Sequence, residues 1–83
     1  MLTPQGPASY YCAQLSALQT ILEQYGYQSI STKSQYEALR YRQAQSIVIL
    51  YYNGTVLLQG ADIETPRQLF ATLAHADQSA LPF

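Results

Sequence analysis

The residues from Ser46 to Gly60 read SIVILYYNGTVLLQG, and they predict the centre of the fold. Two runs of apolar and β-branched residues flank the pair Asn53-Gly54, which favours the positive φ angles of a two-residue type I′ turn. Such a turn would pair Tyr52 with Thr55 and set the register of an antiparallel hairpin. One face of this hairpin would carry Ile47, Ile49, Tyr51, Val56 and Leu58. The opposite face would carry Val48, Leu50, Tyr52, Thr55 and Leu57. Because both faces are apolar, we expect both to be covered, either within the fold or by a partner.

Two strands are predicted just before this hairpin, over residues 27–32 and 35–43. Strand-compatible residues fill the first segment, and Lys33-Ser34 has the composition of a turn. The second segment alternates in polarity, which places Tyr36, Ala38, Arg40 and Arg42 on one face. The two strands could therefore form a first hairpin with one polar side.

An amphipathic helix is predicted on each side of these strands. From about residue 8 to residue 25, apolar residues recur in steps of three and four, as one stripe of a helix requires, and Gly26 follows the last turn. The residues of this stripe are Tyr11, Leu15, Leu18, Leu22 and Tyr25. After the hairpin, Thr65 is the predicted N-cap, Pro66 the first helical residue and Gln68 the partner in a capping box. This second helix should run to about His75.

The order helix, two strands, hairpin, helix predicts a two-layer α+β domain. In that architecture two helices pack on one face of a four-stranded antiparallel sheet, and the other face stays uncovered. We expect residues 1–75 to form this single domain. Residues 76–83 have no hydrophobic period and are predicted to be a flexible tail or the start of a linker.

Composition excludes several classes of protein. The 83-residue chain is 48% apolar, which suffices for a core, but only 11% of its residues are charged, against about 25% in an ordinary domain. With a net charge of −1 the whole chain has no general attraction for nucleic acid or anionic membranes. A single cysteine, Cys12, cannot form an internal disulfide and favours a reducing compartment, and no apolar run is long enough to span a bilayer. We therefore expect a cytoplasmic protein.

Few residues offer chemistry. His75 is the only histidine, and its place near a helix end is already explained by the helix dipole. The same dipole explains Asp62 and Glu64 before a helix start, and Cys12 is most simply a small buried hydrophobe. The sequence lacks zinc-ligand spacing, a phosphate-binding glycine loop and a nucleophile motif. We expect no catalytic activity, no metal and no cofactor, and a small enzyme or ligand carrier is the least favoured alternative.

The basic residues are concentrated just before the central hairpin. Lys33, Arg40 and Arg42 fall within ten positions, and the two arginines share their predicted face with Tyr36. Such a face could follow a phosphate backbone and stack a base on the tyrosine. The alternative for these residues alone is that the arginines merely solvate an exposed strand.

The stretch from Ile47 to Gly60, preceded by a Leu-rich helix and a Tyr-rich strand and followed by a short helix, resembles the N-terminal domain of type 3 ribonucleases H. That domain is similar in fold to half of the TATA-box-binding protein, a curved antiparallel sheet backed by helices. The resemblance implies a substrate-binding appendage that holds RNA/DNA hybrid while a separate domain cleaves it. Where members of the family tend to have lysine after the turn glycine, this chain has Thr55.

Two functions follow as hypotheses. The first is a non-catalytic module that binds an RNA/DNA hybrid or a duplex through Lys33, Tyr36, Arg40 and Arg42, weakly and with a steep dependence on salt. The alternative is a protein-interaction or homodimerisation module that buries the second apolar hairpin face against another chain. The interface residues would then be Val48, Leu50, Tyr52 and Leu57.

Overall fold

The structure is a computed structural model of the chain, which describes residues 2–79 and the side chains of residues 2–73. Along these residues, six strands and two helices follow one another. Their bounds are β1 Leu2–Gly6, β2 Ser9–Cys12, α1 Leu15–Gln24, β3 Gln28–Ile30, β4 Glu37–Gln43, β5 Ser46–Tyr51, β6 Thr55–Gly60 and α2 Glu64–Ser79. The prediction of an α+β domain with an antiparallel sheet and two helices is confirmed.

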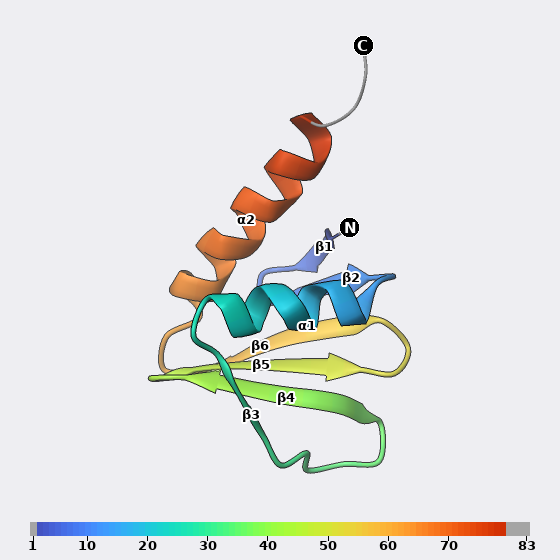
Figure 1. The fold of residues 1–83 in the computed structure, drawn as a ribbon, viewed down its shortest axis with the longest axis vertical. Helices are drawn as coiled ribbons and strands as arrows, with labels where there is room; N and C mark the ends of the chain where they lie inside the picture. Colours follow the sequence, from blue (N-terminus) through green and yellow to red (C-terminus); the bar gives the residue numbers. More distant parts are fainter. Residues whose placement is uncertain (1, 80–83) are drawn as a thin grey trace.

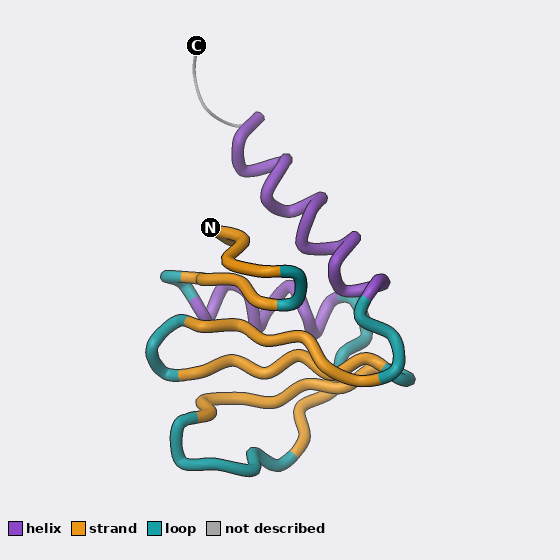
Figure 2. The backbone as a smooth tube through the Cα atoms, turned by 180° about the vertical axis from the view of Figure 1, so that it is seen from behind, coloured by secondary structure: helices purple, strands orange, loops and turns teal. Residues whose placement is uncertain are grey.

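The strands form one antiparallel sheet in the order β1-β2-β6-β5-β4-β3. After β2 the chain crosses the sheet as α1 and reaches the far edge at β3 (Figure 1). Both helices lie on the same face, and Leu18 and Leu22 of α1 join Phe70 of α2 in a single core cluster. In the described part of the chain no helix covers the opposite face, which is turned toward the reader in Figure 2.

The prediction of four strands was wrong, because residues 2–12 add two more. Tyr11 lies four residues before Leu15 and therefore fitted the helical stripe, but the segment forms β2 instead. In β2, Tyr10 pairs with Val56 and Tyr11 with Thr55 of β6. Pairing with an existing strand satisfies the backbone of this tyrosine-rich segment and buries Tyr10 and Cys12, which an isolated helical turn could not do.

The predicted register of the central hairpin was also wrong, by one residue. Strand β5 ends at Tyr51 and β6 begins at Thr55, so the loop has three residues rather than two. Gly54 alone takes the left-handed conformation, with φ of +95°, and its N–H donates to the Tyr51 carbonyl at 3.0 Å. Among the described non-glycine residues only Ala44 has a positive φ, so Asn53 is not in a type I′ turn.

This one-residue change reassigns the two faces of the hairpin, because side chains alternate along a strand. Leu50 pairs with Val56, Ile49 with Leu57, and Val48 with Leu58. The face toward the helices therefore carries Val48, Leu50, Val56 and Leu58. These four side chains are the centre of the core, which Leu2, Tyr10, Cys12, Tyr27 and Tyr41 complete from the other strands and the α1–β3 connection. Cys12 is a small buried hydrophobe, as predicted.

Helix α2 begins earlier than predicted, because Asp62 rather than Thr65 acts as its cap. Asp62 Oδ1 accepts the N–H groups of Glu64 at 3.1 Å and Thr65 at 3.2 Å. Pro66 has no N–H to donate back to the Asp62 carbonyl, and the Ser46 hydroxyl donates to that oxygen instead, at 2.7 Å. The start of α2 is thus bound to the first residue of β5.

The predicted domain boundary at residue 75 falls inside α2. The helix continues through residues 76–79, where a tail was predicted, and residues 80–83 of that predicted tail lie outside the described residues. Phe70 attaches the helix to the sheet through an edge-on contact with the Tyr10 ring, whose centroid lies 5.0 Å away. Neither helix in the described range has the length and apolarity needed to cross a membrane.

Candidate functional site

The sheet face opposite the helices, which we call the uncovered face, is the candidate site. On β4 to β6 its side chains are those that alternate with the core residues. They are Glu37, Arg40, Arg42, Ile47, Ile49, Tyr51, Thr55, Leu57 and Gln59. The rows across the strands mix apolar residues with arginine, glutamine and threonine.

At the centre of this face, neighbouring side chains of the face itself shield each other from solvent. Ile49 is 0% exposed although neither of the two described helices lies above it. Its partners across the strands are Arg40 and Leu57, and Arg40 is itself only 7% exposed. Long arginine side chains can cover apolar surface with their methylene groups, so Arg40 serves here partly as a packing residue.

A bulge in β4 gives Arg40 an acidic partner. The register shifts between Glu37 and Leu39, which turns Glu37 to the uncovered face opposite Tyr51. Glu37 then accepts two bonds from Arg40, from Nε to Oε1 at 2.9 Å and from the terminal nitrogen to Oε2 at 3.1 Å. Glu37 Oε1 also accepts the Lys33 backbone N–H at 3.2 Å.

The two charges of this buried pair stabilise each other. The hydrogen bonds from Arg40 lower the pKa of Glu37, against the opposing effect of burial. The same bonds raise the pKa of the Arg40 guanidinium. The Arg40 guanidinium already donates two hydrogen bonds to the Glu37 carboxylate, so Arg40 is not a free cation for a ligand. This differs from the role that the sequence suggested for Arg40.

Arg42 and Lys33 are the exposed cations on this side of the molecule. Arg42 lies on the uncovered face between Gln28 and Ile47, and its Nε donates to the Ala44 carbonyl at 3.3 Å. Lys33 lies in the loop between β3 and β4. Of the predicted set, Arg40 and Arg42 do share the sheet face, whereas Lys33 and Tyr36 flank it from that loop.

The described charges are divided between the two sides of the sheet. Three of the four basic residues, Lys33, Arg40 and Arg42, lie on or beside the uncovered face. Of the four acidic side chains described, only Glu37 lies there. The other three acidic residues are Glu23, Asp62 and Glu64, and the remaining basic residue is Arg67. All four lie in or next to the helices. A chain with a net charge of −1 therefore presents an excess of positive charge on the face without helices.

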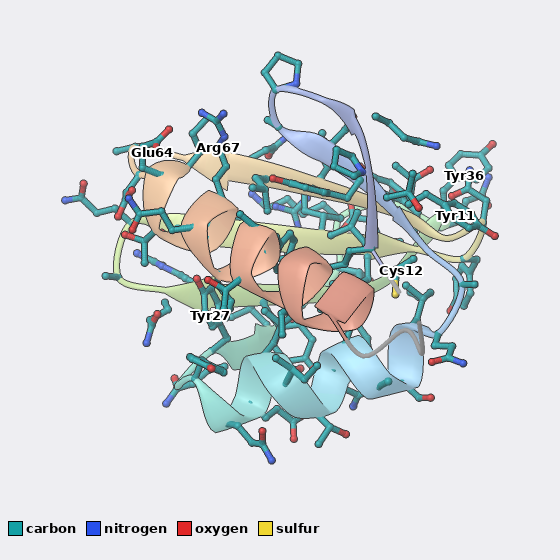
Figure 3. The ribbon with its side chains drawn as sticks, turned by 90° about the horizontal axis from the view of Figure 1, so that it is seen from above. Tyr11, Cys12, Tyr27, Tyr36, Glu64 and Arg67 are labelled. Carbon is teal, nitrogen blue, oxygen red and sulfur yellow. The ribbon has the colours of Figure 1, made fainter. Side chains whose placement is uncertain are left out.

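Four tyrosines gather at one end of the sheet, which we call the tyrosine end; they are Tyr11, Tyr36, Tyr51 and Tyr52. The Tyr52 N–H donates to the Tyr36 carbonyl at 3.1 Å and so joins the two loops. The ring of Tyr11 lies against Gly54, where a Cβ would be 2.5 Å from Tyr11 Cε1. Figure 3 shows Tyr36 and Tyr11 at this end and Glu64 and Arg67 at the opposite one.

The residues predicted for the alternative interface do not share one surface. Val48 and Leu50 are 0% exposed in the core and cannot contact a partner. Leu57 does lie on the uncovered face, half-buried, and Tyr52 projects from the turn. The face prediction was wrong for Val48 and Leu50 because it assumed a two-residue turn. A three-residue loop ending in Gly54 would have indicated Ile47, Ile49 and Tyr51 instead.

No metal-binding cluster of His, Cys, Asp and Glu occurs among the side chains of residues 2–73. The side chain of His75 lies outside the described ones. Comparison of the chain with protein-family models, with curated proteins and with solved structures found no match in any of the three. The interpretation of function therefore rests on the geometry and the charges of the uncovered face.

Proposed function

We propose that this protein is a non-catalytic nucleic-acid-binding module that uses the uncovered face. The observation that carries the proposal is the division of charge, which leaves Arg42 exposed on a face with one described acidic side chain, already paired with Arg40, and Lys33 exposed in the loop beside that face. Exposed tyrosines at the end of the same face offer rings for stacking. An antiparallel sheet with both helices on one side also supports the resemblance to the N-terminal, TATA-box-binding-protein-like domain of type 3 ribonucleases H, and with it an RNA/DNA hybrid or a duplex as ligand.

Each residue has a distinct role in this proposal. Arg42 and Lys33 contact phosphates, and Tyr36 stacks on a sugar or base beside Lys33. Arg40 holds Glu37 and covers Ile49, so it shapes the face without contributing a free charge. A cytoplasmic location belongs to the same proposal and is favoured by the single cysteine, Cys12.

Two free cations predict weak binding that salt removes. Each neutralised phosphate contributes about −0.9 to the slope of log K against log salt, so two contacts predict a slope of about −2. Affinity should then fall roughly tenfold between about 50 mM and 200 mM salt. The face has few charges beyond these, and hydrogen bonds from neutral groups such as Gln28, Thr55 and Gln59 would supply the rest of the contact.

The test is a titration of a labelled RNA/DNA hybrid, followed by fluorescence anisotropy at several salt concentrations. Arg42→Ala should weaken binding at low salt and reduce the slope by about 1. Arg67→Ala is the matched control, because it removes the same charge from the helix side, where Arg67 pairs with Glu64 at 2.6 Å. Absence of binding at low salt, or equal effects of the two substitutions, would refute the proposal.

A second candidate function is self-association or protein binding through the same face. It is favoured by the apolar side chains that remain partly exposed there, namely Ile30, Ile47 and Leu57. Sedimentation over a range of concentrations should then show a dimer that Leu57→Thr, which keeps a strand-compatible residue, dissociates. A monomer at every concentration would contradict this candidate for self-association.

A further inference from the structure

The tyrosine end contains a small pocket that the phosphate contacts do not use. It is lined by Gln35, Tyr36, Tyr51, Tyr52 and Asn53 and has a volume of about 260 Å³. This is slightly below the range of about 300–1,000 Å³ for sites that hold drug-sized ligands, so the pocket suits one ring system. Tyr36 and Tyr52 are 67% and 73% exposed, the two highest values among the exposed large hydrophobic residues described.

The walls of this pocket are held in place by hydrogen bonds that backbone N–H groups donate to a carbonyl and to two side chains. Tyr52 N–H donates to the Tyr36 carbonyl, so the two loops that carry the exposed rings are bound together. In the hairpin turn the Asn53 side-chain oxygen accepts the Thr55 N–H at 2.9 Å. In the other loop the Ser34 hydroxyl accepts the Tyr36 N–H at 3.3 Å. A stacking platform whose backbone is already ordered loses less entropy when a ligand binds.

The lining chemistry matches a nucleobase. Tyrosine rings stack on the π-faces of all bases, and side-chain amides both donate and accept hydrogen bonds at base edges. Gln35 supplies one amide, and the Asn53 Nδ2 group can donate while its oxygen serves the turn. Positive charge is close by, because Lys33 lies in the same loop as Tyr36.

We propose that the pocket of Gln35, Tyr36, Tyr51, Tyr52 and Asn53 binds one unpaired nucleobase next to the phosphate-contacting face. This inference rests on the proposed function and refines it. A base inside a duplex is paired and stacked and cannot enter such a pocket, whereas a base in an overhang, a flap or a single strand can. The protein should therefore prefer a duplex that carries an unpaired end over a blunt one.

The experiment compares two labelled hybrids of the same duplex length, one blunt and one with a short single-stranded overhang, by anisotropy at low salt. The native protein should bind the overhang substrate about 5-fold or more tightly, the smallest effect expected from one stacked base. Tyr52→Ala should reduce this preference and leave blunt-end binding unchanged, while Tyr52→Phe, which keeps the ring, should retain it. Tyr36→Ala should also reduce the preference. Tyr25→Ala is the matched control, since Tyr25 is 54% exposed at the end of α1 and outside the pocket.

The outcomes separate this inference from the function on which it rests. If Arg42→Ala weakens both substrates but the tyrosine substitutions change nothing, the pocket inference is wrong and the nucleic-acid function stands. If neither substrate binds at low salt, both fail. If Tyr25→Ala lowers the preference as much as Tyr52→Ala does, the effect is not specific to the pocket. Binding of a proline-rich peptide that Tyr52→Ala abolishes, without an overhang preference, would assign the pocket to a peptide and overturn the inference.

Discussion

Replacing Gly60 with alanine should destabilise the junction where β6 leads into α2. Gly60 has φ of +100°, outside the region that residues with a Cβ adopt without strain. A Cβ at this position would also collide with the carbonyl oxygen of Gln45 in the β4–β5 turn. That oxygen accepts the N–H of Asp62 at 3.2 Å, and Asp62 caps α2. The substitution therefore strains the backbone and displaces the residue that starts the helix.

The size of the effect follows from these two contributions. A non-glycine residue at such a φ costs about 1–3 kcal/mol, and loss of the hydrogen bond to Asp62 adds about 0.5–1.5 kcal/mol. The sum, about 1.5–4.5 kcal/mol, is a large part of the roughly 4–12 kcal/mol expected for a domain of this length. The midpoint of thermal unfolding should fall by roughly 5–35 °C.

The assay is equilibrium unfolding in urea, followed by far-UV circular dichroism and analysed by linear extrapolation. Gly6→Ala provides the control, because a Cβ on Gly6 would meet only the Ser9 hydroxyl, at 3.2 Å, and its φ is not in the positive range. This control should stay within about 0.5 kcal/mol of the native protein. If the two variants unfold at the same urea concentration, the described conformation of the β6–α2 junction is wrong.

Three further predictions concern the core. Phe70 is fully buried against Tyr10, so Phe70→Ala should lower the free energy of unfolding by about 3–5 kcal/mol in urea melts. Phe70→Leu should lower it by clearly less, and equal losses would contradict this burial. Burial, and a hydrogen bond donated to Glu23, raise the pKa of Tyr41 from 10.0 to about 12, so stability should be lost as the pH rises from about 10 to about 12. Urea melts across that window should show a smaller loss in Tyr41→Phe, and an unchanged loss would count against the raised pKa. Cys12, at 0% exposure, should react with a thiol reagent only when the chain unfolds, and rapid labelling of the native protein, detected by mass spectrometry, would disprove its burial.

Local sequence patterns predicted several elements because they depend on neighbours in the chain. The helical stripe from Leu15 to Leu22 lies within α1, and the apolar runs around Gly54 are β5 and β6. Of the candidate binding residues, the alternation of β4 correctly placed Arg40 and Arg42 on one face. These features needed only hydrophobic period and turn composition, which are local properties.

The chemistry of the site could not be predicted in the same way. A one-residue bulge turns Glu37 toward Arg40, and this pairing removes one of the three expected cations from the binding face. The four residues of the tyrosine end come from three separate parts of the chain and meet only because β2 pairs with β6 and the Tyr36 loop bonds to the hairpin. No residue spacing in the sequence indicates which of these distant segments are in contact.

The sequence by itself determined that this is a small α+β domain with little charge, a central hairpin at Ser46–Gly60 and a helix on each side of it. The tertiary structure decided that residues 9–12 are a strand, that the hairpin loop has three residues, and which hairpin face is buried. The physical reason is that turns and periodicity are set by nearby residues, whereas strand partners and buried faces are selected by contacts between distant ones. The hairpin at Ser46–Gly60, which contains no charged residue, is thus buried under helices on one side. Its other side forms part of the face on which Arg42 is exposed and Arg40 is paired with Glu37.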